Sequence, residues 1–321
     1  MPQALPLTRY NSLNCFHYFR APLRRSPPDM ALPFPAAKPG WYGESWVRYS
    51  LSSTRYSTYH PQVFKAKADL WAIVNDYSLA VFGRSELGRP LPMSEMLSYY
   101  RRLVLWLENL PEALSPRKIV FPHQLLLHMQ YNLILVGILK PVRNQGWNSC
   151  GDGAQLVTPR QAYETAVVRY ETVMRLYYLR HGFDAPNSFL VNFMGHLGQM
   201  AIDKIDAASP NSSMMELNHL QSTVLLVAKG LYEQGSSHYV AMAVFRLQLK
   251  LMRQEEVEML KRLVRVEMRE ELDVHGRLKH PVQSDWPAYG RAYNEEHLSL
   301  SDKLEVLSLG VDESEMVSSP A

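Results

Sequence analysis

The sequence predicts an all-α protein, a bundle or array of antiparallel helix pairs with disordered N- and C-terminal tails. Three observations support this fold class. Apolar residues recur at three- and four-residue spacing in one segment after another from position 61 onwards. Proline and capping-box signals precede several of these segments, and no segment alternates between apolar and polar residues in the way that a strand does. The helices therefore run in pairs that short loops connect.

Composition bounds the class of protein further. The chain has 321 residues, of which 46% are hydrophobic and 11% aromatic, enough for a sizeable core. The net charge of +3 is too small to argue for binding to nucleic acid or to a membrane surface. Two cysteines, Cys15 and Cys150, cannot form a disulfide framework. The most apolar run, Leu133–Leu139, is far shorter than the roughly 20 residues that span a bilayer. We expect a soluble protein in a reducing, intracellular compartment.

The first 60 residues contain no clear helical pattern. Residues 1–40 hold eight of the 21 prolines and are predicted to be disordered. Trp41–Tyr59 is dense in aromatic residues and arginine. Such a segment can stack on single-stranded bases. An irregular strap that packs its rings onto a helical core is the favoured interpretation, because buried packing is the commoner use of aromatic side chains.

Two helices are predicted next. Pro61–Phe82 has proline at a first-turn position, a helical apolar stripe, and Gly83 at its end. The stripe of the second helix ends at Pro111 and consists of Met96, Tyr100, Leu103, Leu107 and Leu110.

Pro122–Pro141 is the segment around which the rest of the chain is organised. Its polar positions Gln124, His128 and Asn132 fall four apart and form one narrow stripe on a helix. The two turns after Asn132 are apolar on all sides. Such a helix belongs inside a larger helical body, and its polar stripe is predicted to form hydrogen bonds between helices.

The next helix has the clearest start signal. Thr158-Pro159-Arg160-Gln161 is a capping box with proline at the first helical position. The helix is predicted to run to about Arg180 and to end at Gly182. Its predicted core face consists of Ala162, Ala166, Tyr170, Val173 and Tyr177.

Further helices follow. Pro186 is predicted to open one whose inward residues are Leu190, Phe193, Leu197 and Ala201. Ser213-Met214-Met215-Glu216 is predicted as a second capping box, for a helix that ends near Gly235.

The chain then has a helical pattern up to Gly276, which is too long for one globular helix, so a break is expected near Arg253. Within it, Lys250–Glu271 carries six basic and six acidic residues. Its apolar seam is interrupted by Glu256 and consists of Met252, Met259, Leu263 and Val266. An amphipathic helix that lies on its own domain is favoured over a coiled coil. Ser301–Leu309 is a candidate for one last short helix in a tail over 291–321.

Tests for catalytic chemistry give no candidate. Gly146–Gly151 lacks the first glycine of a nucleophile elbow around Ser149. Asn75-Asp76 does not continue into a diphosphate-binding magnesium motif, and no aspartate-rich cluster is present. His123 and His128 lie five residues apart, which does not place them side by side on a helix for metal binding. No catalytic, cofactor-binding or metal-binding residue is therefore predicted, and the chain is expected not to be an enzyme.

The segment Leu127–Pro141, LHMQYNLILVGILKP, resembles a recurring helix of the fungal-specific transcription factor domain. This domain is the middle homology region of fungal zinc binuclear cluster regulators, and the resemblance is closest to the nitrogen-assimilation type. Lys140 stands where arginine is usual. Phe64–Gly83 and the run Tyr100–Leu110 are similar to the segments that precede this helix in the family. The residues on the family pattern are Leu127, His128, Met129, Tyr131, Leu139 and Pro141.

The resemblance implies a function. It implies a non-catalytic regulatory domain over 41–290, similar to the C-terminal part of such a regulator, which acts on RNA polymerase II gene expression in the nucleus. The implied partners are transcriptional cofactor proteins, a small metabolite, or the regulator's own DNA-binding part, with a homodimer as a further possibility and no membrane. The family's zinc cofactor is held by six cysteines in an N-terminal cluster, which two cysteines cannot form. We therefore expect no zinc and no direct nucleic-acid binding by this chain. The alternative is a helical scaffold or dimerisation module without a transcriptional role.

Overall fold

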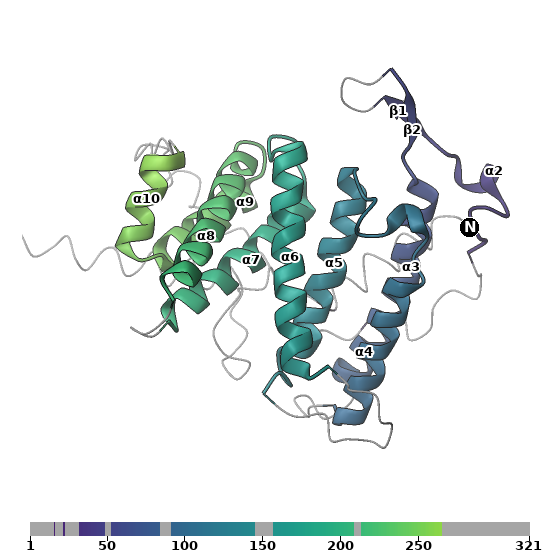
Figure 1. Ribbon diagram of the computed structural model, residues 1–321, viewed down its shortest axis with the longest axis horizontal. Helices are drawn as coiled ribbons and strands as arrows, with labels where there is room; N and C mark the ends of the chain where they lie inside the picture. The colour runs from purple at the N-terminus through teal and green to yellow at the C-terminus, as the bar shows by residue number, and fades with distance from the viewer. Residues whose placement is uncertain are drawn as a thin grey trace, which may run out of the picture. The chain divides into compact units, whose positions relative to one another are not determined.

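The computed structural model describes Phe16, Pro22 and residues 32–48, 53–83, 91–144, 157–208 and 213–264 (Figure 1). Within these residues the fold is all-α, with one two-stranded sheet in addition to the helices. The predicted C-terminal tail, the helix predicted over 301–309 and most of the loop predicted after Asn144 lie outside the described residues. The same holds for most of the predicted N-terminal disordered segment.

The chain divides into two compact units, Met1–His181 and Gly182–Ala321. Each unit has its own buried residues, so each is described by itself. The predicted boundaries of a single regulatory domain over 41–290 stay a prediction.

The first unit contains four long helices whose predicted ends are close to the observed ones. Pro61 lies in the first turn of α3, and Gly83 follows the last residue of that helix. Thr158 and Gln161 form the predicted reciprocal capping box at the start of α6: Thr158 N donates to Gln161 Oε1 at 3.1 Å, and Gln161 N donates to Thr158 Oγ1 at 3.2 Å. Gly182 after α6 has φ +65°, as a helix-terminating glycine requires. The bounds are α3 His60–Phe82, α4 Met93–Glu108, a 3₁₀ turn Glu112–Leu114, α5 Pro122–Leu139 and α6 Pro159–His181.

Helix α5 is the buried helix of this unit. Every residue from Gln124 to Leu139 is buried except Gly137. The helix packs against α3, α4 and α6, which is why it carries apolar residues on all sides. A Cβ at Gly137 would lie only 2.9 Å from the ring of Phe16, so this position has to be glycine for the two to be in contact. The prediction that this helix belongs inside a helical body is confirmed.

The core of α6 differs from the prediction at one position. Ala162, Ala166, Tyr170 and Tyr177 are buried as predicted, but Val173 is only half-buried and the neighbouring Met174 is fully buried instead. The buried positions move around the helix because 3.6 residues per turn do not match a strict seven-residue repeat.

The predicted irregular strap over Trp41–Tyr59 is wrong in two respects. The segment contains a short helix, α2 Pro39–Tyr42, and an antiparallel hairpin of β1 Trp46–Arg48 and β2 Arg55–Ser57. Its rings also do not all pack onto the helices, since Trp41 and Trp46 are at least half exposed. Figure 1 shows the hairpin projecting from the start of α3. The strands were missed because each is three residues long, too short to show an alternating pattern.

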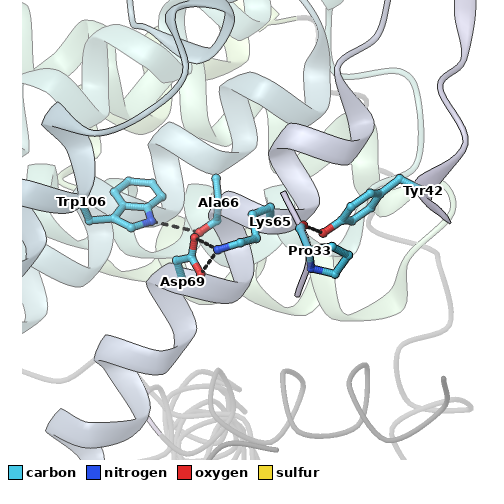
Figure 2. A network of polar contacts seen from close by, with 6 residues as sticks. All are labelled: Pro33, Tyr42, Lys65, Ala66, Asp69 and Trp106. Atoms are coloured by element: carbon cyan, nitrogen blue, oxygen red, sulfur yellow. Dashed lines mark hydrogen bonds and ion pairs between the residues drawn. The ribbon is translucent and has the colours of Figure 1, made fainter. Parts of the chain in front are cut away.

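Parts of the predicted disordered segment 1–40 are ordered among the described residues. Phe16 is buried and lies against Tyr77 of α3, with ring centroids 5.9 Å apart. Tyr42 Oη donates a hydrogen bond of 2.5 Å to the carbonyl of Pro33, and this contact lies beside Lys65 and Asp69 of α3 in Figure 2. The prediction of disorder therefore does not hold at these positions, because aromatic anchors bind the proline-rich segment to α3.

The second unit contains α7 Ser188–Asp206, α8 Met214–Gly235, α9 Tyr239–Leu251 and α10 Gln254–Val264. Helix α8 packs against α7, α9 and α10. The inward residues predicted for α7 are all buried: Leu190, Phe193, Leu197 and Ala201. The helix begins at Ser188 and not at Pro186, because the Asn187 side chain caps it by accepting from the backbone N–H groups of Phe189 and Leu190.

Two other predictions for this unit have different outcomes. Ser213 stands at the N-cap of α8 as predicted, but its side chain makes no capping hydrogen bond, so the predicted capping box is absent there. The break expected near Arg253 is confirmed, since α9 ends at Leu251 and α10 begins at Gln254. Arg253 Nη2 donates to the carbonyl of Ile205 at 2.5 Å, and this bond binds the break to the end of α7.

Helix α10 lies on its own unit, as predicted, but with a different inward face. Leu260 and Glu256, four residues apart, are its buried positions, whereas Met259 of the predicted seam is half-buried. Gln221 of α8 donates to Glu256 Oε1 at 3.3 Å, so a polar contact replaces the expected apolar one. The side chains of Leu263 and Val266 lie outside the described residues, and a homodimer through this helix stays a prediction.

Among the described residues, no helix combines the length and apolar character that crossing a lipid bilayer requires.

Candidate functional site

The residues on the family pattern lie along the interior of α5. Leu127, Met129 and Leu139 are completely buried, and His128 and Tyr131 are 2% exposed. Pro141 follows the end of the helix and is exposed. This arrangement gives the pattern a packing role, since five of its six positions cannot contact a ligand at the surface.

The polar stripe of α5 begins with a local contact. Gln124 Oε1 accepts hydrogen bonds from the backbone N–H groups of Val120 and Phe121, at 2.9 and 3.0 Å. Its side chain therefore satisfies donors at the start of its own helix. The predicted bond to another helix is absent at this residue.

His128 forms the predicted bond between elements. Its Nε2 lies 2.8 Å from the carbonyl oxygen of Leu114, so the ring donates from this nitrogen and joins α5 to the 3₁₀ turn. Asn132 Nδ2 donates to the carbonyl of His128 at 2.7 Å, which is again a bond within α5. Its Oδ1 is buried and has no hydrogen-bond partner in the described part of the chain. The stripe thus contains one link between elements and three local bonds.

A stack of rings lies at the first turn of α5. The rings of His60 and His123 are 4.0 Å apart and nearly parallel, and Phe121 stacks on the other side at 5.8 Å. His123 Nε2 donates to the carbonyl of Thr58 at 2.7 Å. Burial, opposed in part by this hydrogen bond, lowers the pKa of His123 to about 4. The neutral ring therefore joins α5 to Thr58, which lies two residues before α3.

The end of α6 holds the segment that leads into α5. Arg180 Nη1 donates to the carbonyl of Ile119 at 2.8 Å, and His181 Nε2 lies 2.9 Å from the carbonyl oxygen of Val120. Both side chains lie in the last turn of α6, where positive groups are favourable for the helix dipole. The backbone just before α5 is thus held by hydrogen bonds from Gln124 of α5 itself and from the last turn of α6.

Trp106 is the main residue that sequence reasoning missed. It is buried, its ring stacks on Tyr131 of α5 at 5.3 Å, and its Nε1 donates to the carbonyl of Ala66 in α3 at 3.0 Å (Figure 2). One side chain of α4 therefore contacts both α3 and α5. Its position three residues after Leu103 was the signal, because residues three apart share a helix face.

Two glutamines of the second unit were also missed. Gln234 at the end of α8 accepts from the backbone N–H of Asn187 at 2.7 Å and donates to the carbonyl of Ala185 at 2.8 Å. Gln248 of α9 donates to the carbonyl of Gly195 in α7 at 2.9 Å. An isolated glutamine in an apolar stripe carries no sequence signal that distinguishes these structural roles from solvent exposure.

The described residues assemble no evident chemical centre. No group of three or more histidine, cysteine, aspartate or glutamate side chains in this part of the chain is placed to hold a metal ion. Asn75 is buried in α3, and Asp76 forms an ion pair of 2.6 Å with Arg102 of α4. The segment Gly146–Gly151 lies outside the described residues. What the arrangement around α5 can do is fix the relative positions of helices.

Comparison with known proteins gives one partial match. No family model matches the sequence, and no solved structure matches it. The chain is 30% identical over 122 residues to the nitrogen assimilation transcription factor nirA of Emericella nidulans. These residues are 38% of this chain and 13% of that protein, so the chain spans only a small part of the length of this relative. The similarity supports a role in the regulation of transcription.

Proposed function

We propose that this chain is a non-catalytic regulatory domain of a fungal transcription regulator of the nitrogen-assimilation type, and that it acts on RNA polymerase II gene expression in the nucleus. The observation that carries the proposal is the 30% identity over 122 residues to a nitrogen assimilation transcription factor. The pattern along Leu127–Pro141 supports the same assignment, because its residues follow that of the fungal-specific transcription factor domain.

The hydrogen bonds around α5 fix the positions of the helices, and this supports a role in which the domain passes on the effect of a contact with another molecule. Its polar side chains form hydrogen bonds between elements, as His123 does to Thr58 and Trp106 does to Ala66. A body with such fixed geometry suits the presentation of a surface to other proteins. In this proposal the domain restrains or transmits activation through contacts with transcriptional cofactor proteins, with a small metabolite, or with a DNA-binding part.

The DNA-binding part would lie outside this chain. The family's zinc cluster uses six cysteines, and the chain has only Cys15 and Cys150. We therefore propose no zinc in this chain and no direct contact with DNA.

Comparison of transcripts tests this proposal in the native context. Strains of the source organism with and without the coding sequence should differ in the abundance of a defined set of transcripts. A difference that depends on the nitrogen source supports the nitrogen-assimilation type. Equal transcript profiles under all nitrogen sources would contradict the proposal, and a strain that carries the restored coding sequence is the control.

A further inference from the structure

The hairpin of β1 and β2 presents two bare faces. Residues directly opposite in an antiparallel pair point to the same face, and the pairs are Trp46 with Ser57, Val47 with Tyr56, and Arg48 with Arg55. Because side chains alternate along a strand, Trp46 and both arginines share one face. Trp46 is 59% exposed, and on the other face Val47 and Tyr56 are 37% and 46% exposed.

The base of the hairpin, in contrast, is firmly held. Ser45 and Thr58 are joined by a hydroxyl contact of 2.6 Å and by the backbone bond from Thr58 N to the carbonyl of Ser45. Glu44 Oε1 accepts from Tyr59 N at 3.1 Å. The carbonyl of Thr58 accepts from His123 of α5. The hairpin is therefore fixed to the helical unit at its base while its faces stay open.

The backbone at this junction is also strained. Tyr59 has φ +55°, and it is the only non-glycine residue with a positive φ among the described residues. A bulky residue in this conformation is strained, and the surrounding structure has to offset this cost. This strain indicates that the surrounding contacts hold the hairpin in one direction relative to α3, because an unstrained backbone at Tyr59 would lead the chain in another direction.

The face that carries Arg48 and Arg55 has two positive charges and no acidic side chain paired with them among the described residues. Arg48 and Arg55 lie directly opposite each other, a destabilising arrangement for like charges. Neither arginine forms an ion pair with another side chain in the described ranges. An isolated two-stranded hairpin is only marginally stable in water. A ligand with negative charges would remove the repulsion and complete the sheet.

We propose that this hairpin, Trp46–Arg48 with Arg55–Ser57, is a docking surface for an extended acidic peptide segment of a partner protein. The outer edge of each strand has no strand partner among the described residues, so a peptide can add as a third strand. A carboxylate at the register level of Arg48 and Arg55 on that strand would lie near both arginines, which face each other across the hairpin. An aromatic or aliphatic side chain on the same face would contact Trp46. This surface goes beyond the proposed function and does not depend on it.

The charges favour a peptide over a single-stranded nucleic acid. The hairpin offers two arginines, whereas binding along a phosphate backbone uses a longer positively charged groove. The whole chain is close to neutral, with 34 basic and 31 acidic residues. Two arginines beside one tryptophan match a short acidic and apolar segment better.

Fluorescence anisotropy with the full chain tests the proposal directly. The probe is a short fluorescein-labelled peptide in which every second residue is threonine and the residues between are alternately aspartate and leucine, so that aspartate and leucine share one face. The comparison probe has asparagine in place of aspartate. We expect saturable binding of the aspartate peptide that weakens as salt is added. The double variant Arg48→Glu/Arg55→Glu and the variant Trp46→Ala should each bind at least ~10-fold more weakly. Arg117→Glu, an exposed arginine of the same unit, is the matched control and should bind as the wild type does.

A charge swap guards against loss of folding. The double glutamate variant should gain binding to the same peptide with lysine in place of aspartate, which an unfolded hairpin would not do selectively. Circular dichroism should be unchanged, because the substituted side chains are exposed. Absence of saturable binding by the wild type, or equal binding by all variants, would overturn the proposal. Binding of oligo-dT in place of the peptide, with the same dependence on Arg48 and Trp46, would overturn it in favour of a nucleic-acid site.

Discussion

Polar side chains that are buried or half-buried hold the first unit together. His123, His128 and Trp106 each donate one hydrogen bond to a backbone carbonyl of a different element. A buried donor that loses its acceptor, or an acceptor that loses its donor, costs about 1–3 kcal/mol. These three side chains therefore affect stability more than their small number of bonds would indicate, and each can be tested by substitution.

Trp106→Phe should destabilise the first unit by about 1–3 kcal/mol, because it removes the bond to the carbonyl of Ala66 and part of the ring that stacks on Tyr131. Urea unfolding followed by circular dichroism measures this change. Leu105→Ala on the same helix is the control, since Leu105 is 55% exposed and should shift the free energy of unfolding by no more than about 0.5 kcal/mol. Equal effects of the two substitutions would contradict the role of Trp106.

Stability should fall in mild acid. Burial lowers the pKa of His123 to about 4, and burial also lowers the pKa of His128 from its ordinary value of 6.5. The unfolded chain therefore binds protons between about pH 6.5 and 4 that the folded protein does not bind, so the free energy of unfolding decreases as the pH falls through this window. For His123 we expect a loss of about 1–2 kcal/mol at pH ~5, reduced by the partial exposure of the ring.

Urea unfolding at pH ~7.5 and ~5 measures this dependence. His123→Gln keeps a donor for Thr58 but cannot be protonated, so its stability should differ less between the two pH values. His219→Gln, at an exposed histidine of α8, is the control. A pH dependence that His123→Gln leaves unchanged would show that His123 does not cause it.

At the scale of the helix, not every polar residue at an N-terminus forms a capping hydrogen bond with its side chain. Thr158 and Asn187 accept hydrogen bonds from the first turn of their helices, whereas the Ser213 side chain does not. Thr158→Ala and Asn187→Ala should each cost about 1 kcal/mol. Ser213→Ala should cost no more than about 0.5 kcal/mol. Thermal unfolding of the three variants ranks them, and a loss for Ser213→Ala equal to the other two would be inconsistent with the observed caps.

The contact between α7 and α8 depends on a glycine. A Cβ at Gly230 would lie 2.4 Å from the sulfur of Met194 and 2.7 Å from the ring of Phe183. In an exposed helix, glycine to alanine is stabilising by about 1 kcal/mol. Gly230→Ala should instead destabilise by about 1–3 kcal/mol, since the buried neighbours have to move. Gly40→Ala, where nothing lies within 4 Å of the added carbon, is the control, and urea unfolding that shows no loss for Gly230→Ala would refute the tight contact.

Helices with strong end signals could be predicted from the sequence, as α3, α5 and α6 show. Each of them has proline in its first turn, glycine follows α3 and α6, and Lys140-Pro141 follows α5. The hairpin could not be predicted in this way, because strands of three residues leave no periodic pattern and depend on pairing across a loop. The buried role of Glu256 was also missed, since its contact with Gln221 is formed between helices far apart in the sequence.

The candidate site was predictable only in part. That the helix within Pro122–Pro141 is buried followed from its composition, and the bond made by His128 followed from the narrow polar stripe of this helix. The stack of His60, His123 and Phe121 did not, because it joins the starts of two helices that are separated by about 60 positions in the chain. Contacts of this kind depend on tertiary structure and leave no local signal.

For the molecule as a whole, the described residues form two helical units, and the proposed function rests on the similarity of part of the chain to a transcription factor. The first unit contains the helix that carries the family pattern, together with the exposed hairpin. The buried helix carries the pattern on which the resemblance rests, and its described surroundings offer surfaces and not a metal centre. A regulatory domain would exert its effect through such surfaces, and only when it is folded.

Reporter output from a tethered chain tests the regulatory role most directly. The full chain is fused to a heterologous DNA-binding domain and compared with that domain alone at equal protein abundance. Leu135→Asp is the matched variant, because a carboxylate at this buried position of α5 should unfold the first unit. We predict that the wild-type fusion raises or lowers reporter output and that the Leu135→Asp fusion does not. A folded wild-type fusion whose output equals that of the DNA-binding domain alone would contradict the proposed function.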